Sequence, residues 1–103
     1  MAGLGVRGLY KGYKHLSGKY NSLRSGHIFR DSRGHVNPKY ETSQGRYSTL
    51  YESTAIPKNH NSDILSSFQR NNTGYAGYSR QYNAGEVWVQ TRNGEIINAG
   101  VNR

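Results

Sequence analysis

The sequence contains no cysteine among its 103 residues, and this absence excludes disulfide bonds, thiolate metal ligands and a cysteine nucleophile. It also lacks an apolar run of transmembrane length. The opening Met1–Leu4 has none of the apolar stretch that a secretory signal peptide requires. We therefore expect a domain that folds without disulfide bonds and has no membrane-spanning segment.

Large apolar residues are scarce. Hydrophobic residues make up 33% of the chain, and one Trp and two Phe stand beside nine Tyr. This length fits one compact domain, 1–103, in which we expect residues 1–7 to be a linker or a frayed end. Because a tyrosine-rich core keeps hydroxyls near its surface, we expect an α+β fold, with N-terminal helices packed on one face of a small antiparallel sheet.

Acidic side chains are few as well. Six Asp and Glu stand against fourteen Lys and Arg, which gives a formal net charge of +8. Residues 1–46 hold nine basic and two acidic residues, whereas residues 47–103 hold five basic and four acidic ones. A basic half joined to a nearly neutral half favours a polyanionic partner. Nucleic acid is the first candidate, an anionic membrane the second and an acidic protein the third, and charge that serves solubility alone remains an alternative.

Apolar residues recur at helical spacing in three stretches. The first, 8–24, has intervals of three and four residues, although each of its glycines costs about 1 kcal/mol in a helix interior. A second helix is predicted over 43–54, with Ser43 as its N-cap. A third is predicted over 63–70, with Ser62 as its N-cap. The helices are therefore expected to precede the strands.

The C-terminal third predicts the strands. A polar segment with three tyrosines, 75–82, favours a strand with an irregularity at its glycine. Asn93-Gly94 separates two further strands, 86–92 and 95–101, and is the strongest short hairpin motif, because both of its residues accept positive φ. Three consecutive antiparallel strands are therefore expected.

Alternation along 86–92 gives the sheet two different faces. Val87 and Val89 share one face, which we expect to lie in the core. Trp88, Gln90 and Arg92 share the other. An aromatic ring, an amide and a guanidinium on one sheet face can stack a base, read its edge and hold a phosphate. The alternative is that Trp88 anchors the core and the two polar side chains are only solvated.

Two histidines and two arginines, His27, Arg30, Arg33 and His35, lie within nine residues. Imidazoles suit general acid–base catalysis because their pKa lies near neutrality. Guanidinium groups suit phosphate, which they bind in a fixed fork. This combination supplies what RNA cleavage without a metal requires: a base for the 2′-hydroxyl, an acid for the leaving oxygen and cations for the phosphate.

Two other interpretations of the cluster remain open. One histidine can pack against a tyrosine while the other is a solvated turn residue. A zinc site would need His27, His35, His60 and a carboxylate to assemble, since there is no thiolate and no His-Glu-x-x-His helix. We therefore expect no catalytic metal.

Two blocks of the sequence resemble a known toxin family. Residues 26–36 resemble the GHIFRDxxGH opening of a class of bacterial polymorphic toxin tips, and residues 86–102 resemble the matching VWVQxRNGxIINxGxN tail. Such tips end contact-dependent growth inhibition proteins and related secreted toxins, and they are similar to the barnase–EndoU–colicin–RelE group of RNases. The segment between the blocks departs from the family, and Arg46 stands as the equivalent of an arginine that members carry after the second histidine.

The resemblance implies a barnase-like fold and a metal-independent endoribonuclease without a cofactor, often directed at tRNA. The toxin would be displayed by a larger secreted or cell-surface protein, act as a monomer in the target-cell cytoplasm, and be blocked by a cognate immunity protein, which the positive charge predicts to be acidic. The implied catalytic residues are His27, His35, Arg30 and Arg92. The implied substrate-binding residues are Arg33, Arg46, Trp88, Gln90 and Asn98.

Two functions from other classes compete with this one. A non-catalytic RNA-binding module would bind RNA tightly without cleaving it, and the histidine pair argues against it. A membrane-active bacteriocin would need a strongly amphipathic segment, and the best candidate, 8–24, has too many Gly and Tyr residues.

Overall fold

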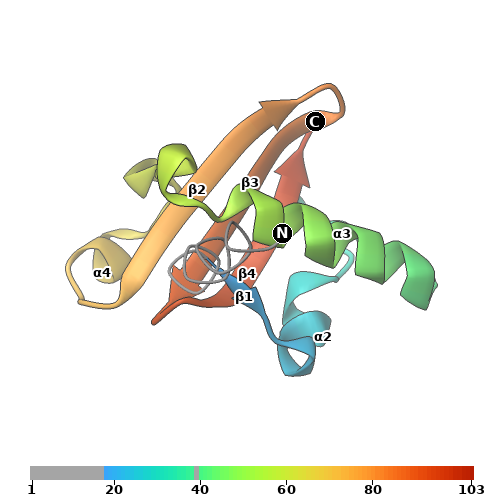
Figure 1. Cartoon of the computed structure of the whole chain (residues 1–103), viewed down its shortest axis with the longest axis horizontal. Coiled ribbons are helices and arrows are strands. Elements are labelled where there is room, and N and C mark those ends of the chain that lie inside the picture. The colour runs from blue at the N-terminus through green and yellow to red at the C-terminus, as the bar shows by residue number, and fades with distance from the viewer. Residues whose placement is uncertain (1–17, 39) are drawn as a thin grey trace, which may run out of the picture.

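The computed structural model describes residues 18–38 and 40–103 as an α+β domain, as predicted. Its four-stranded sheet has the order β1–β4–β3–β2, and α3 crosses one face of it (Figure 1). The strands are β1 (Lys19–Tyr20), β2 (Tyr75–Tyr82), β3 (Gly85–Arg92) and β4 (Glu95–Asn102).

The sheet is mixed, so the prediction of a purely antiparallel sheet is wrong at one edge. β2, β3 and β4 form the expected antiparallel meander, but β1 runs parallel to β4. The Lys19 N–H donates to the Gly94 carbonyl at 2.8 Å, which brings the two-residue β1 beside the start of β4. The edge pairing depends on a contact between distant parts of the chain, and no local pattern specifies it.

Helices occupy both sides of the sheet. The α-helices are α2 (Ser25–Ile28), α3 (Glu41–Thr54) and α4 (Ser67–Arg70), and the short 3-10 turns are η1 (Ser22–Arg24), η2 (Pro57–Asn59) and η3 (Ser62–Ile64). Among the helices of the described residues, only α3 is longer than four residues, and it packs on the face of the sheet that carries Val87. The Asn61 carbonyl just before η3 and the Ile64 side chain of η3 lie against Gly77 on the opposite face, so helical segments are not confined to one face as predicted.

The core lies between α3 and the sheet. Val87 and Val89 are buried beneath the helix, as the alternation predicted. Tyr51 of α3 is fully buried and stacks on Phe29, with ring centroids 6.1 Å apart. Phe29 thereby ties the segment after α2 to α3.

Two tight hairpins set the register of the meander. Tyr82 pairs with Gly85 across a two-residue turn. At the second hairpin Asn93 has φ 52° and Gly94 has φ 82°, the paired positive values that the sequence predicted. A bulge between Gln90 and Thr91 shifts the pairing with β4.

The predicted helix over 8–24 is wrong where the structure describes it. Residues 18–24 form β1 and η1, and the rest of that prediction, with residues 1–7, lies outside the described residues. Gly18 is instead buried where a Cβ would overlap that of Ala55, and Lys19 pairs with the start of β4. Tertiary packing therefore overrides the helical spacing.

The other helix predictions need smaller corrections. α3 begins two residues before the predicted 43–54, so Ser43 lies within the helix and does not cap it. The predicted helix over 63–70 divides into η3 and α4, because Leu65 turns inward in an extended conformation and Ser66 starts a new helix with a capping box.

Strand β2 is more regular than predicted. It pairs with β3 without interruption through Gly77, where an irregularity was expected. The glycine serves a close approach instead: the Asn61 N–H donates to the Gly77 carbonyl at 2.8 Å, and a side chain at this position would overlap the Asn61 backbone.

Candidate functional site

The loop that follows α2 docks on the Trp88 face of the sheet. The Gly34 carbonyl accepts hydrogen bonds from the Trp88 indole N–H at 3.1 Å and from the Val101 backbone N–H at 3.0 Å. Gly34 has φ 81°, and Gly100 lies directly beneath its carbonyl, where a Cβ would overlap the oxygen. The two blocks that carry the family resemblance are therefore in direct contact.

His35 lies at the edge of this loop, half-buried against Trp88. Its ring meets the indole edge to face, with centroids 5.2 Å apart and an interplanar angle of 83°. Its Nδ1–H donates to the Ile28 carbonyl at 3.0 Å. Because a carbonyl only accepts, this bond places the proton of a neutral His35 on Nδ1 and leaves a lone pair on Nε2.

His27 is exposed in the single turn of α2, and Arg30 holds it. The Arg30 Nη1 donates to the His27 Nδ1 at 2.9 Å and to the His27 carbonyl at 2.8 Å. The pKa of His27 lies below its ordinary value, first because partial desolvation disfavours the charged ring, and then because positive charge on Arg30, and on His35 when that ring is protonated, opposes protonation. The lowered pKa favours the neutral ring of His27, with Arg30 bound to it.

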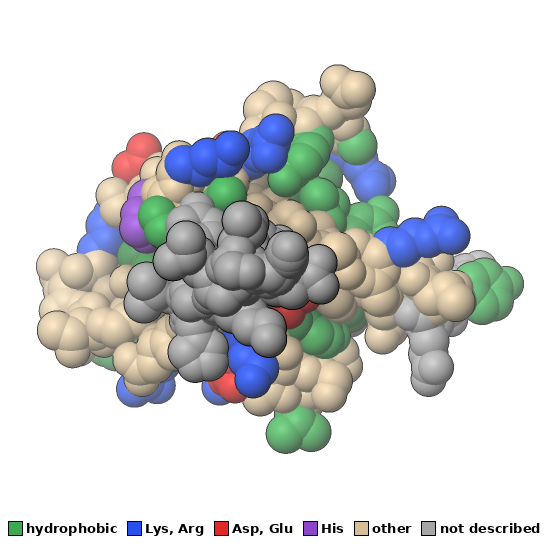
Figure 2. All heavy atoms as spheres, viewed as in Figure 1, with side chains coloured by type: hydrophobic (Ala, Val, Ile, Leu, Met, Phe, Trp, Pro, Cys, Tyr) green, Lys and Arg blue, Asp and Glu red, His purple; other side chains and the backbone are tan. Residues whose placement is uncertain are grey.

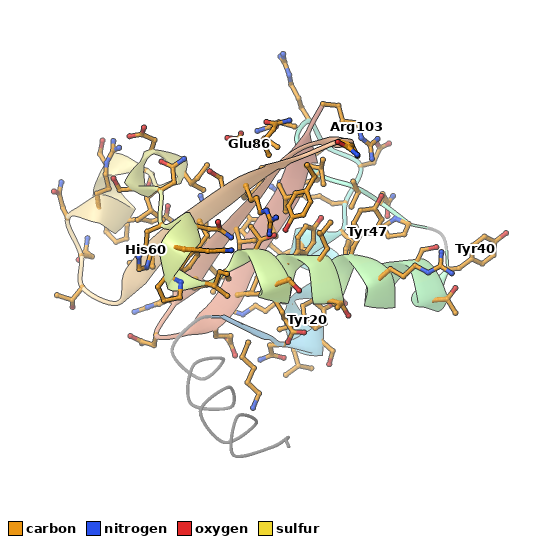
Figure 3. The ribbon with its side chains drawn as sticks, turned by 45° about the horizontal axis from the view of Figure 1, so that its top comes forward. Tyr20, Tyr40, Tyr47, His60, Glu86 and Arg103 are labelled. Atoms are coloured by element: carbon orange, nitrogen blue, oxygen red, sulfur yellow. The ribbon has the colours of Figure 1, made fainter. Side chains whose placement is uncertain are left out.

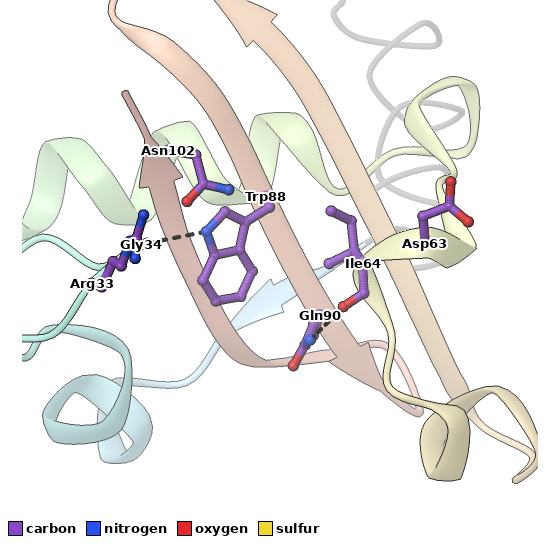
Figure 4. A pocket seen from close by; sticks show the side chains of 7 residues that line it. All are labelled: Arg33, Gly34, Asp63, Ile64, Trp88, Gln90 and Asn102. Carbon is purple, nitrogen blue, oxygen red and sulfur yellow. Dashed lines mark hydrogen bonds between the residues drawn. The ribbon is translucent and has the colours of Figure 1, made fainter.

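A surface pocket of about 300 Å³ opens beside Trp88, the residue on which His35 packs (Figure 4). Trp88 and Gln90 of β3 form its floor, with the Gly34 loop on one side and η3 on the other. Its lining residues are Arg33, Gly34, Asp63, Ile64, Trp88, Gln90 and Asn102. The pocket offers an aromatic face, an exposed guanidinium and amide groups, which suits a planar polar ring attached to an anionic group.

The amide of Gln90 is engaged within the protein. Its Nε2 donates to the Ile64 carbonyl at 2.8 Å, and its Oε1 accepts from Gln69 Nε2 at 3.4 Å. Gln90 therefore fastens η3 and α4 to the sheet and shapes the pocket floor. Asn98 lies opposite Gln90 on β4, where its Oδ1 accepts the backbone N–H of Ala99 at 3.2 Å.

Of the predicted site residues, Arg33, Trp88 and Gln90 line the pocket. Arg92 ends β3, four residues beyond Trp88, and its guanidinium lies over the Tyr75 ring, 5.3 Å from the centroid. Arg46 is exposed on α3, which covers the opposite face of the sheet. The structure thus joins His27 to Arg30 and His35 to Trp88, with Arg33 in the adjoining pocket, but does not bring Arg92 or Arg46 into the same site.

Asn102 and Asp63 line the pocket but were not among the predicted site residues. Strand parity gave a clue for Asn102, since it shares the Trp88 face, and its Nδ2 donates to Glu86 at 3.4 Å. No sequence pattern pointed to Asp63, because the docking of η3 on the sheet is a contact between segments far apart in the chain.

Lys and Arg side chains on the α3 face lie in several separate groups around it (Figure 2). Of the nine basic residues in the first 46, five lie within the described part: Lys19, Arg24, Arg30, Arg33 and Arg46. Arg24 is ion-paired with Glu95 at 3.2 Å. Arg33, by contrast, lines the pocket, and Arg30 lies earlier in the same loop, bound to His27.

Within residues 18–38 and 40–103, no group of three or more His, Asp or Glu side chains is placed to hold a metal ion. His60, the third histidine of the zinc alternative, stacks on Tyr78 with centroids 4.8 Å apart, near the end of α3 opposite Tyr40 (Figure 3). The same part of the chain has no helix long and apolar enough to span a membrane.

Comparisons with known proteins give no match: no family model, no curated protein and no solved structure is similar to this chain.

Proposed function

We propose that this protein is a metal-independent endoribonuclease, the toxic tip of a larger toxin that inhibits competing bacteria. The observation that carries the proposal is the docking of the His27–His35 loop against Trp88, next to a pocket with an exposed arginine. General bases, phosphate-binding cations and a surface for a base are thereby gathered on one side of the sheet.

The hydrogen bonds of the two histidines suggest their roles. His35 is the general base, because its Nδ1–H is bound to Ile28 and its Nε2 lone pair can take the 2′-hydroxyl proton. The 2′-oxygen then bonds to phosphorus as the bond from phosphorus to the 5′-oxygen breaks, which leaves a 2′,3′-cyclic phosphate. His27 is the general acid that protonates the departing 5′-oxygen.

Arg30 links phosphate binding to the protonation of His27. The guanidinium and a protonated Nδ1 are both donors, so Arg30 cannot remain bound to a charged His27 ring. A substrate phosphate that draws Arg30 away frees Nδ1 to accept a proton, and the resulting imidazolium donates from Nε2. Arg30 and Arg33 together offset the negative charge that grows on the phosphate in the transition state.

Trp88 supplies the surface on which a base stacks, and Asn102 and Asp63 offer polar groups to its edge. Gln90 and Asn98 act by holding the pocket floor in shape. Arg92 and Arg46 lie outside the pocket, so we assign Arg92 to substrate binding farther along the strand and give Arg46 no role in the chemistry.

The partners follow from this activity and from the charge. The substrate is RNA, with tRNA as the class that the toxin resemblance suggests. An acidic immunity protein would protect the producing cell, since a net charge of +8 attracts a negative partner. The protein would act as a monomer in the cytoplasm of the target cell.

The test is incubation of the purified protein with total bacterial RNA in EDTA, followed by a denaturing gel and analysis of the RNA ends. We expect discrete fragments that end in a 2′,3′-cyclic phosphate or its 3′-phosphate product. The His27→Ala/His35→Ala double variant is the control for contaminating nuclease. RNA that stays intact in EDTA and is cut after a divalent ion is added would refute the mechanism.

A non-catalytic RNA-binding module is the second candidate, because Trp88 and the arginines would serve binding without any proton transfer. It predicts that the same sample binds RNA tightly and leaves every strand intact, with or without EDTA.

A further inference from the structure

A second aromatic surface lies on the Trp88 face, beyond the pocket. Phe68 of α4 is 66% exposed, so its ring is accessible to a ligand. Its ring meets Tyr75 edge to face, with centroids 6.2 Å apart. The Arg92 guanidinium lies over Tyr75, 5.3 Å from the ring centroid. We call Phe68, Tyr75 and Arg92 the aromatic platform.

The platform is continuous with the pocket. Tyr75 pairs with Arg92 across β2 and β3, and strand parity places both on the same face as Trp88. Gln90 lies between Trp88 and Arg92, and its bond to Gln69 joins it to the helix that carries Phe68. Arg92 lies four positions beyond Trp88 along β3, a distance of about 13 Å. A few nucleotides of an extended nucleic acid can span this distance.

The charges of the platform suit a polyanion. Glu95 pairs with Arg92 across β3 and β4, but its carboxylate forms an ion pair with Arg24. Arg92 is exposed and keeps its N–H donors available for a phosphate. An exposed ring beside a guanidinium without a carboxylate partner is the combination that single-strand binding proteins use, with bases on aromatic faces and the backbone on cations.

We infer that the aromatic platform is a binding site for unpaired nucleotides, so that the substrate crosses the Trp88 face as a single strand from the pocket to Phe68. This inference extends the proposed function, because it specifies the strand state of the substrate. It does not depend on cleavage, since a bound strand can be measured when no bond is broken. Bases in a duplex are stacked on one another and cannot use the platform.

The experiment measures the affinity of the full chain for an RNA octanucleotide with 2′-O-methyl groups, by fluorescence anisotropy. The blocked 2′-oxygens prevent cleavage, and the length lies within the site sizes of single-strand binding folds. Phe68→Ala should weaken binding of the single strand by about 5- to 100-fold, the range expected when one base–aromatic stack is lost. Binding of the matching duplex should be the same for wild type and variant.

Three further variants make the result specific. Phe68→Tyr keeps the ring and should retain the affinity, whereas Phe68→Leu keeps an apolar side chain without a flat face and should weaken binding. Tyr40→Ala is the matched control, because Tyr40 is 71% exposed at the outer end of α3 and should have no effect (Figure 3). Arg92→Gln should lower the salt dependence of single-strand binding by about 0.7 in the log–log slope, as expected for one lost phosphate contact.

Unchanged single-strand affinity in both Phe68→Leu and Arg92→Gln would overturn the inference. Equal losses for single strand and duplex would do the same, because they would indicate charge or folding and not stacking. Tight single-strand binding by a protein that cuts no RNA would keep the platform and refute the proposed RNase. Cleavage of RNA in EDTA, together with unchanged single-strand affinity of the Phe68→Leu variant, would support the RNase and refute the platform.

Discussion

The Gly34 carbonyl and the Trp88 indole N–H, 54 residues apart in the chain, share a hydrogen bond of 3.1 Å that fixes the histidine loop to the sheet (Figure 4). The same carbonyl accepts the Val101 N–H, so one oxygen joins the loop to two strands. The position of His35 on Trp88 follows from this junction. The stability of the domain and the geometry of its candidate site therefore depend on the same contacts.

Gly100→Ala should separate the loop from the sheet. A Cβ at this position overlaps the Gly34 carbonyl oxygen, so we expect a loss of about 1–3 kcal/mol in the free energy of unfolding, measured by urea denaturation. Gly45→Ala is the control, because Gly45 lies inside α3 with open space around it and should stabilise the protein by about 0.5–1 kcal/mol. Equal effects of the two substitutions would contradict the close packing of the loop.

Trp88→Phe should remove the indole N–H while keeping an aromatic ring beneath His35. The Gly34 carbonyl keeps its bond from Val101, so no buried acceptor loses all its partners. We therefore expect a loss of only about 0.5–1.5 kcal/mol in the free energy of unfolding, the range for one neutral hydrogen bond. The measurement is again urea denaturation, and an unchanged midpoint would show that the bond contributes nothing to stability.

His27→Ala and His35→Ala should each slow RNA cleavage by about a hundredfold or more, because each removes one proton-transfer group. The check is single-turnover cleavage beside the melting temperature of each variant. His27 is exposed, so its removal should leave the melting temperature close to that of wild type. Folded variants that cut at the wild-type rate would disprove the catalytic assignment.

Arg30→Gln should raise the pKa of His27 toward its ordinary value of about 6.5. The positive charge of Arg30 opposes protonation of the ring, and its removal leaves partial desolvation, His35 and Arg24 as the remaining causes of the lowered pKa. The measurement is an NMR titration of the His27 ring protons. Arg46→Gln, on the opposite face of the sheet, should leave the titration unchanged, and a shift of the same size there would contradict a local effect of Arg30.

An acidic immunity protein should bind faster at low than at high ionic strength, because the net charge of +8 steers a negative partner. Stopped-flow association at several salt concentrations measures this dependence. An association rate that does not change with salt would refute charge steering, whatever the affinity of the complex.

Local sequence determined the three antiparallel strands, the Asn93-Gly94 hairpin and helix α3. Asn93-Gly94 forces a tight turn because both residues adopt positive φ, and alternation then assigns Val87 and Val89 to the core. The apolar spacing in 43–54 predicted α3 because a helix that crosses a sheet needs one apolar face. The residue types of the candidate site, His27 and His35 with their arginines, could likewise be read from the sequence because they are close neighbours along the chain.

The tertiary structure alone decided which of those residues meet. Gly18 packs against Ala55, and Lys19 pairs with the start of β4, so β1 stands where a helix was predicted. The docking of Gly34 over Gly100 places His35 on Trp88, and the docking of η3 turns Gln90 from an expected base reader into a structural amide. These outcomes depend on packing between segments far apart in the chain, where close approach and hydrogen-bond satisfaction outweigh local propensity.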